Sequence, residues 1–430
     1  MGSPVSTFVT VSSPAADPAR PHVVVIHRWR DSYAHYLDYL DHDRYFVTYI
    51  TTEVGEVGVP AKAAEVVLVP ATDDLAVVRS AVASLAQRYG APSAVVGLKE
   101  DDLLVAAELR VEWDCPGQRP EELLPFRDKL LMAQAVAAEG LPLPTFAPAP
   151  DSDSVMAFAG EHGWPVVLKP RIGSSSEGVV VIDGPAELAE VHFETRSPSI
   201  VQVRNPHPIY HVDGLFRDGR TEVFRASRYL NTCLGFRTGD VLGSVEEDDP
   251  AVVAAVGTWA SRFIGALAAD PVVFHLEVFV ERTDDGITCS FLETGARVGG
   301  AEIPFLWRDI HGYDLMEAAF RIQLGEAPHP VPDEAADAAG AVAGWLLVPA
   351  PAERPCRIDL VTPMVGRDPG PYAESLLQAG EVLPLADAYY EHVGGRFRFR
   401  GHSSAEVEAA ITATATDFKV TAEPLSPAVL

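Results

Sequence analysis

The chain has 430 residues, of which 47% are hydrophobic and 22% are charged, a balance typical of a globular protein with two or three domains. Its net charge of −28 and its pI near 4.7 argue against nucleic acid or an anionic membrane as a partner, because both reward basic patches. No stretch approaches the roughly 20 apolar residues that a membrane helix requires, and the N-terminus lacks the basic start and apolar centre of a signal peptide.

The cysteines are scattered along the chain, with no close pair of the kind that zinc sites use: Cys115, Cys233, Cys289 and Cys356. This usage is typical of reduced thiols in the cytosol. We therefore expect a cytoplasmic protein without a membrane partner and without a metal held by cysteine.

The N-terminal part of the chain has an alternating pattern. Residues 1–20 are rich in serine and proline and are predicted to be a disordered lead. Four short apolar runs, each typical of a buried parallel strand, follow at residues 22–26, 45–50, 66–69 and 93–97. A helical pattern covers residues 75–89. Alternating strands and helices predict a small doubly wound α/β domain over residues 21–118.

A helical segment over residues 120–140 carries Lys129 within an otherwise apolar stretch and ends at a glycine. Such a lysine could approach a site between domains, although a surface position is the more common interpretation. Prolines punctuate residues 141–150, which predicts a connection into a second domain.

Strand patterns dominate residues 165–297, and helical patterns cover 251–267 and 315–324. We therefore predict an α+β domain over residues 119–326, with a lid part at about 150–203. A proline-rich break follows this domain. The remaining residues, 327–430, mix helical patterns with a strand-like run at 396–400 and predict a third, α+β domain.

A glycine- and serine-rich loop follows a predicted strand that ends in Lys169. Small residues leave backbone N–H groups free to face phosphate oxygens, and a nearby lysine supplies the charge that phosphates favour. The loop is not a Walker motif, because no glycine-lysine-serine follows it and no helix begins there. A flexible hairpin with a half-buried lysine is an equally good interpretation of this segment alone.

A predicted hairpin places two glutamates face to face. The sequence Asp284-Asp285-Gly286 suits a three-residue loop with Thr283 opposite Ile287, and counting back puts Glu277 opposite Glu293. Like charges directly opposite on a sheet repel, and a divalent cation would remove the conflict. Mg²⁺ typically takes one or two protein carboxylates plus substrate phosphates, so a nucleotide is the natural companion. Two solvated glutamates on an exposed face are the alternative.

Several polar residues lie close together in sequence near Asp213. They are His207, Tyr210 and His211, and their spacing fits no metal site. We therefore interpret them as satisfied or exposed polar residues. His275 alternates onto the same face as Glu277, where contact with an amine substrate and simple packing are equally good interpretations.

In order, these segments resemble an ATP-grasp enzyme over residues 120–305. The similarity is carried by Arg127-Asp-Lys129, the strand and loop at Lys169, the segment Ser199–Arg204 with His211-Val-Asp-Gly214, the glutamate pair and Arg297-Val-Gly-Gly300. The resemblance implies an ATP-grasp fold in which the first α/β domain precedes a central ATP-grasp domain and a mixed C-terminal domain follows.

The resemblance also implies roles for individual residues. Lys129 and Lys169 would hold the phosphates of ATP, and Glu277 with Glu293 would bind Mg²⁺, with Mn²⁺ as an alternative ion. The loop residues Ser174, Ser175, Ser176 and Gly178 would close over the phosphates, and Gln202, Val203 and Arg204 would present backbone groups to adenine.

One departure from the usual ATP-grasp pattern favours a particular subfamily. Many ATP-grasp enzymes have an asparagine two residues after the second glutamate, where this chain has Gly295, so metal binding would rest on the two glutamates and ATP. The pattern His-x-Glu at 275–277 with Glu-x-x-x-Arg-x-Gly-Gly at 293–300 is similar to that of amino-acid ligases that form dipeptides and related amides. In them the arginine, here Arg297, stabilises the acyl phosphate and its tetrahedral successor.

The expected activity is therefore an ATP-dependent carboxylate–amine ligase that forms an amide or peptide bond through an acyl phosphate and releases ADP and phosphate. Arg297 and Lys169 would be catalytic, and Arg297, Gly299, Gly300 and His275 would contact small carboxylate and amine substrates. Two alternatives are a carboxylase like biotin carboxylase, which the serine-rich loop argues against, and an ATP-binding regulatory protein without turnover. A homodimer is expected from the frequency of such assemblies.

Overall fold

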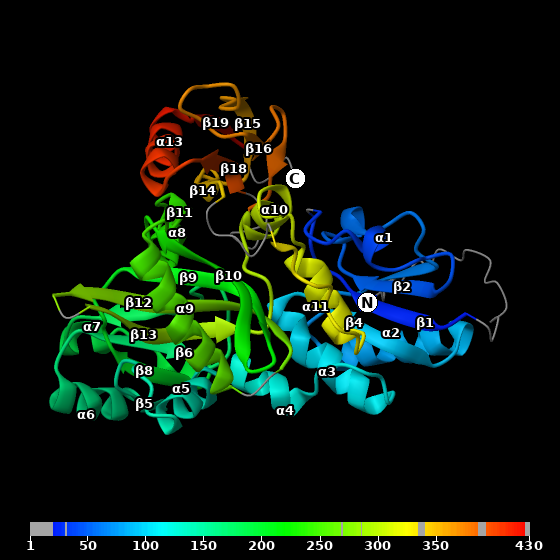
Figure 1. Cartoon of the computed structure of the whole chain (residues 1–430), viewed down its shortest axis with the longest axis horizontal. Coiled ribbons are helices and arrows are strands. Elements are labelled where there is room, and N and C mark those ends of the chain that lie inside the picture. Colours follow the sequence, from blue (N-terminus) through cyan, green and yellow to red (C-terminus); the bar gives the residue numbers. More distant parts are fainter. Residues whose placement is uncertain are drawn as a thin grey trace. The chain divides into compact units, whose positions relative to one another are not determined.

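The computed structural model describes residues 20–30, 32–267, 270–284, 286–333, 340–385 and 393–425. The predicted disordered lead therefore lies outside the described residues except for Arg20, as does Asp285 of the predicted hairpin loop. The chain divides into two compact units (Figure 1). The first ends at Arg119 and includes Gln323–Glu326, and the second contains Pro120–Ile322 and the chain from Ala327 onward.

The first unit contains a parallel sheet with the strand order β3-β2-β1-β4. Its strands are β1 (His22–Ile26), β2 (Phe46–Thr51), β3 (Glu65–Leu68) and β4 (Pro92–Gly97), and its helices are α1 (Tyr36–Tyr39), α2 (Leu75–Tyr89) and α3 (Leu103–Glu112). The Asp74 side chain accepts hydrogen bonds from the first turn of α2, and Gly90 ends that helix with a positive φ of 85°, which favours glycine. The predicted α/β fold of this part is confirmed.

A buried arginine ties residues 323–326 to this unit. The side chain of Arg110, on α3, is fully buried and donates to the backbone carbonyl of Val95 on β4 (2.8 Å) and to the side-chain carbonyl of Gln323. The Gln323 amide also pairs with both backbone groups of Gly97, at 2.8 and 2.9 Å. Gln323 thus satisfies polar groups at the end of β4, which is one of the two edge strands of the sheet.

The predicted helix over residues 120–140 is interrupted. The structure has α4 (Pro120–Leu123), a 3-10 turn (Leu124–Phe126) and α5 (Lys129–Ala138). The interruption has two causes, the proline in the 3-10 turn and the Asp128 side chain, which accepts hydrogen bonds from the first turn of α5. The sequence predicted Lys129 inside a helix. In the structure it is the first residue of α5.

A small antiparallel sheet, ordered β5-β8-β6-β7, follows in the second unit. Its strands are β5 (Phe146–Ala149), β6 (Val166–Pro170), β7 (Val180–Ile182) and β8 (Ser199–Val203), and its helices are α6 (Ser152–His162) and α7 (Pro185–Leu188). A compact apolar core that includes Val155, Phe158, Leu168 and Val201 holds these elements together. They cover most of the predicted lid part.

The second unit is built around an eight-stranded sheet ordered β13-β12-β9-β10-β11-β14-β18-β16. Its strands are β9 (Ile209–Arg217), β10 (Arg220–Tyr229), β11 (Leu242–Glu246), β12 (Val272–Thr283), β13 (Gly286–Gly295), β14 (Val342–Pro349), β16 (Ala373–Leu376) and β18 (Val393–Gly401). A small sheet contains β15 (Cys356–Val361), β17 (Val382–Leu383) and β19 (Val420–Pro424). Because the large sheet runs on into residues after 327, the separation of a third domain stays a prediction.

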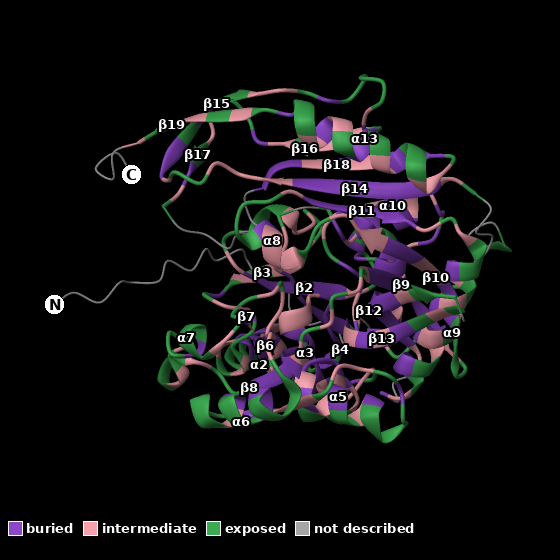
Figure 2. Ribbon diagram, turned by 90° about the vertical axis from the view of Figure 1, so that its left-hand side faces the viewer, coloured by how far each residue is buried: buried purple, intermediate pink, exposed green. Residues whose placement is uncertain are grey.

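Helices pack on the apolar face of this sheet. They include α9 (Pro250–Gly265) and α13 (Ser404–Asp417). The unit also contains α8 (Cys233–Arg237), α10 (Ile303–Asp309) and all of α11 (Leu315–Gln323) except its last residue, which belongs to the first unit. Gly257 of α9 lies directly against the Phe224 ring, and α13 covers β14 and β18 (Figure 2). Among the described residues, no helix is both long and apolar enough to cross a membrane.

The opposite face of the large sheet is polar and yet largely buried. Alternation along each strand brings polar residues into two cross-strand rows: Glu293, Glu277, His211, Ser227 and Glu246 in one, and His275, Asp213 and Arg225 in the next. Most of these side chains are less than a tenth exposed. Buried polar groups are costly unless they are paired, so a polar sheet face indicates a site.

The hairpin between β12 and β13 differs from the prediction at its tip. Thr283 pairs with Gly286 and not with Ile287, so the turn is one residue tighter than expected. A bulge directly after Glu277 restores the register, and Glu277 pairs with Glu293 as predicted.

A buried carboxylate affects the stability of the first unit. Asp102 is fully buried, and neither of its carboxylate oxygens has a hydrogen-bond partner among the described residues. A guanidinium nitrogen of Arg28 lies 3.9 Å from one oxygen. Burial raises the pKa of Asp102 to about 6, because Arg28 and Thr72 offset only part of the desolvation cost.

We expect Asp102→Asn to increase the stability of this unit relative to the wild type as pH rises. The folded protein binds this proton more tightly than the unfolded chain, so the wild type loses stability between about pH 4 and pH 6. The difference between the two pKa values corresponds to roughly 3 kcal/mol at pH 8 and to about half of that at pH 5. Chemical denaturation at both pH values measures it. A stability difference that is the same at pH 5 and pH 8, or that Asp101→Asn reproduces, would contradict this account.

Candidate active site

Two glutamates lie opposite each other at the edge of the large sheet. Glu277 of β12 and Glu293 of β13 are cross-strand partners on the polar face. Their side chains are 14% and 35% exposed, so both lose much of their hydration but remain accessible. The solvated surface pair that the sequence left open is therefore wrong.

Protein groups already offset the charge of both carboxylates. The ammonium nitrogens of Lys129 and Lys169 lie 3.7 and 4.0 Å from Oε2 of Glu293. The Tyr229 hydroxyl donates to Oε1 of Glu277 at 3.0 Å, and Nε2 of His275 lies 3.7 Å from the same atom. Burial alone would raise the pKa of Glu277, but His275 and Tyr229 outweigh it and hold that pKa below its ordinary value.

The two lysines come from different elements and converge on one carboxylate. Lys169 of β6 is 4% exposed, and burial lowers its pKa to about 8, opposed by Glu293 and reinforced by Lys129. Lys129 donates a side-chain hydrogen bond to the carbonyl of Gly173 at 2.9 Å. The half-buried lysine that the sequence allowed at 169 is thus wrong, since the side chain is almost fully buried beside Lys129 and Glu293.

The glycine- and serine-rich loop connects β6 to β7. Ser175, Ser176 and Gly178 have φ values of 55°, 55° and 68°, so three of its residues adopt the left-handed conformation. A Cβ on Gly178 would lie 2.9 Å from the ring of Pro170, which favours glycine there. The predicted roles of Ser174, Ser175, Ser176 and Gly178 toward phosphate stay predictions.

The segment predicted to face adenine is the end of β8. Gln202 lies within this strand, between β5 and β6, and its side chain is buried. The N–H groups of Val203 and Arg204 donate within the chain, to the carbonyls of Thr145 and Pro165. An adenine contact through those two N–H groups would have to replace these bonds, so the predicted role of the segment stays a prediction.

The segment after β13 packs against the polar face. A Cβ on Gly299 would lie 2.3 Å from Oδ1 of Asp213 and 2.9 Å from Nδ1 of His275, whereas a Cβ on Gly300 would meet nothing within 4 Å. Arg297 donates to the carbonyl of Val298, and its positive charge lies close enough to His275 to act on the pKa of that imidazole. The structure thus brings Arg297, Gly299 and His275 together beside Glu277.

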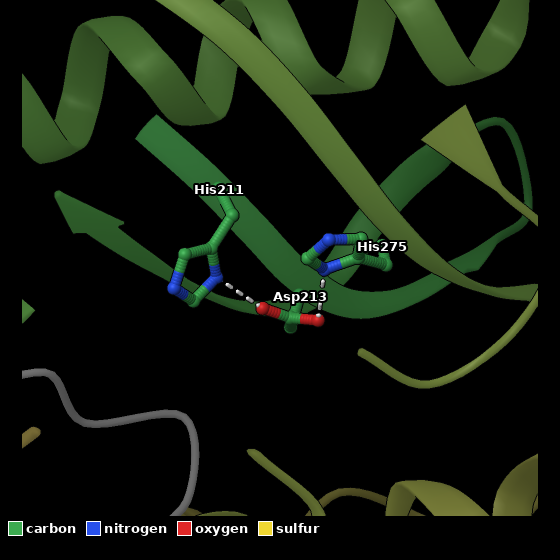
Figure 3. A group of neighbouring side chains, drawn as sticks. All are labelled: His211, Asp213 and His275. Carbon is green, nitrogen blue, oxygen red and sulfur yellow. Dashed lines mark hydrogen bonds and ion pairs between the residues drawn. The ribbon is translucent and has the colours of Figure 1, made fainter. Parts of the chain in front are cut away.

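A buried group of three side chains lies next to this site, and only part of it was found in the sequence (Figure 3). Nδ1 of His211 lies 2.6 Å from one oxygen of Asp213, and Nδ1 of His275 lies 2.8 Å from the other. His211 and Asp213 are near neighbours in the sequence, but their grouping with His275 was not predicted, because it depends on β12 pairing with β9. The available signal was the alternation of polar with apolar residues along Ile209–Arg217 and Val272–Thr283.

The donor set of the glutamate pair fits a hard divalent cation. Two carboxylates from adjacent strands offer oxygen ligands, which Mg²⁺ prefers, and the two ammonium groups beside them suit the phosphates of a nucleotide. Glu277 and Glu293 would hold the ion. Of the free cysteines, Cys115, Cys289 and Cys356 are buried. Cys233 lies near the pair: burial raises the pKa of its thiol, and the charges of Glu277 and Glu293 add to this.

Comparison with known proteins supports this interpretation. No family model matches the chain. In sequence it is 22% identical over 275 residues to an L-arginine-specific L-amino acid ligase of Bacillus subtilis, an alignment that covers 61% of this chain and 65% of that protein. It is 29% identical over 106 residues to a D-alanine–D-alanine ligase of Streptomyces griseus, with 22% and 25% covered. The alignments thus span less than two thirds of these curated relatives.

Solved structures resemble nearly the whole chain. An L-amino acid ligase from Bacillus licheniformis matches with a TM-score of 0.73 and 17% identity, over 94% of this chain and 99% of that one. The biotin carboxylase domain of a 2-oxoglutarate carboxylase from Hydrogenobacter thermophilus, solved with MgADP, ADP and bicarbonate, matches with a TM-score of 0.67 and 14% identity, over 94% and 92%. The predicted ATP-grasp fold and the resemblance to L-amino acid ligases are confirmed.

Proposed function

We propose that this ATP-grasp protein is an ATP-dependent carboxylate–amine ligase. The observation that carries the proposal is the cross-strand pair Glu277 and Glu293 with Lys129 and Lys169 converging on it. Oxygen ligands for a cation beside two ammonium groups are what a metal–nucleotide complex needs. The sequence similarity to amino-acid ligases favours an amide-forming reaction over other uses of ATP, and the structural match, which a biotin carboxylase domain shares, supports the fold.

In the proposed reaction a substrate carboxylate attacks the terminal phosphoryl group of ATP, and ADP leaves. The acyl phosphate that forms is then attacked by a neutral amine, which yields an amide and releases phosphate. Lys129 and Lys169 would hold the phosphates. A divalent ion bound by Glu277 and Glu293 would disperse the charge that develops on the phosphate oxygens.

Arg297 would act on the carboxylate side of the reaction. Its guanidinium belongs to the segment that packs beside His275, next to the glutamate pair. A fixed cation at this place suits the charge of the acyl phosphate and of the tetrahedral species that follows. Closure of the glycine- and serine-rich loop would keep water from the acyl phosphate.

The two alternatives receive less support. A biotin carboxylase domain shares the fold, but the amino-acid sequence of this chain is similar to those of two amino-acid ligases. A regulatory protein without turnover would not need the arginine segment packed beside the metal ligands. The small-molecule substrates, a homodimer and a cytoplasmic location stay proposals.

The test is release of ADP from Mg²⁺ and ATP in the presence of pooled carboxylic and amino acids, with hydroxylamine as a substitute amine. We expect a hydroxamate that forms only with ATP and an acid, because hydroxylamine traps an activated carboxylate. Mass spectrometry of the product identifies the acid. Binding of ATP without release of ADP for any acid would favour the regulatory alternative, and dependence of ADP release on bicarbonate would favour a carboxylase.

Replacement of Lys169 by alanine should reduce kcat/KM for ATP by about 10²-fold or more, because a buried cation aimed at the phosphates is lost. The melting temperature should change little. Steady-state kinetics with varied ATP measures the effect, and the exposed Lys62 provides a matched control as Lys62→Ala, which should behave as wild type. Unchanged turnover in Lys169→Ala would remove this residue from the site.

The variant Glu293→Gln should raise the Mg²⁺ concentration needed for half-maximal activity by about 10-fold or more, since one of the two anionic ligands becomes a neutral amide. Titration of Mg²⁺ at fixed ATP measures this requirement. Glu281→Gln, on the same hairpin but beyond the site, is the control. A normal Mg²⁺ requirement in Glu293→Gln would place the ion elsewhere.

A further inference from the structure

A buried polar chain connects the interior of the large sheet to Glu277. It begins at the Ser244 hydroxyl of β11, which lies 2.7 Å from Nε2 of His211. It continues through Asp213, whose two oxygens lie 2.6 and 2.8 Å from His211 and His275. His275 then lies 3.7 Å from Glu277. The Asp213 side chain is 2% exposed, so its two imidazole partners are fixed on both sides.

The contacts of Glu277 are one-sided. Tyr229 and His275 both approach Oε1, from β10 and from the same strand as Glu277 itself. Within the part of the chain that the structure describes, no ion pair or hydrogen bond reaches Oε2, and the side chain remains 14% exposed. One oxygen is therefore anchored by the protein and the other is presented outward, as a ligand to an ion requires.

Asp213 and His275 also pack against the segment that carries Arg297 and Gly299. The backbone of Gly299 lies so close to Asp213 and His275 that a Cβ would come within 2.3 and 2.9 Å of their polar atoms. Gly299 is two residues from Arg297 in the chain. Any shift of the Asp213–His275 pair must therefore move this segment as well as Glu277, because interiors are close-packed.

A second metal ion held by His211, Asp213 and His275 is the competing interpretation of these residues. Two ligand atoms around a tetrahedral zinc lie roughly 3.3 Å apart, given bonds of about 2.0 Å. The distances of 2.6 and 2.8 Å are those of hydrogen bonds from imidazole to carboxylate. The remaining ring nitrogens also face partners of their own, Ser244 and Glu277.

We propose that Asp213 and His275 are positioning residues, which hold Glu277 with one oxygen free for the metal ion and at the same time seat the segment that carries Arg297. This inference rests on the proposed function, because it assigns the pair to the metal–nucleotide site. It also assigns His275 to the metal side of the site, not to contact with the amine substrate.

The test is direct binding of Mn²⁺ as a probe, followed by electron paramagnetic resonance in the presence of ADP, without turnover. Asp213→Asn keeps the shape of the side chain but cannot accept from both imidazoles, and we expect Mn²⁺ affinity to fall about 10- to 100-fold. Affinity for ADP without metal should remain within about twofold, since the lysines are untouched. Equal Mn²⁺ affinity in Asp213→Asn and wild type would overturn the proposal.

Glu246→Gln is the matched control for loss of a buried carboxylate. Glu246 lies on the same sheet face and accepts from Nε2 of His311 at 2.6 Å and from the N–H of Ala343 at 2.9 Å, but it has no contact with Glu277. We expect this variant to lose stability to a similar degree and to keep its Mn²⁺ affinity. A loss of Mn²⁺ affinity equal to that of Asp213→Asn would reduce the effect to general destabilisation and overturn the proposal.

A second set of variants covers the case in which Asp213→Asn fails to fold. The amide of His275→Asn can still reach Asp213 but not Glu277, so Mn²⁺ affinity should fall while the melting temperature is kept. Gly299→Ala should also weaken Mn²⁺ binding, by displacing the pair, whereas Gly300→Ala should not. The opposite order of the two glycine variants would overturn the proposal.

The failure of the proposed function has a different signature. If the wild type binds neither Mn²⁺ nor ADP, the ligase proposal itself is wrong. If the wild type binds both and the variants do too, only the positioning role is wrong. Metal analysis of the dialysed protein completes the test, because stoichiometric zinc that is lost in His211→Ala would establish the competing metal site.

Discussion

The site depends on the enforced proximity of two carboxylates. Pairing of β12 with β13 fixes Glu277 opposite Glu293, and a sheet register cannot slip by one residue without turning every side chain to the other face. The repulsion that results must be offset. Here the two glutamates are offset by different groups, lysines for Glu293 and a tyrosine with a histidine for Glu277. This asymmetry gives the two carboxylates different roles.

Glu293 faces groups that a nucleotide would also need. Its neighbours Lys129 and Lys169 are drawn from α5 and β6, and Lys129 also donates to the loop carbonyl of Gly173. Phosphates and a cation arriving together would exchange these contacts for stronger ones, since the cation replaces the lysines at Glu293 and the phosphates replace Glu293 at the lysines. Charge balance is thus kept with and without ligand, which allows the site to be folded in advance.

Many of the helices and strands, and the pairing of the two glutamates, could be predicted from the sequence because they depend on local patterns. The helix at Leu75–Tyr89 matched because it has an aspartate cap and a glycine stop, and Glu277 was placed opposite Glu293. The predicted turn of that hairpin was wrong. The real turn is one residue shorter, and a bulge of one residue compensates for it, so the number of residues between the two glutamates fits both arrangements. The helix break before Lys129 was missed because a side-chain cap outweighed helix propensity.

What could not be predicted depends on the order of strands. His275 meets Asp213 because β9 lies between β12 and β10, and 62 residues separate the two side chains in the chain. Residues far apart in sequence can share a hydrogen bond only when the topology brings their strands together. The buried Asp213 is stabilised because each of its oxygens has an imidazole donor, and removal of either histidine would leave one buried oxygen without its partner. Glu277 is thus linked through His275 and Asp213 to His211 and Ser244 on neighbouring strands, whereas Glu246 on the same sheet face is held by separate partners.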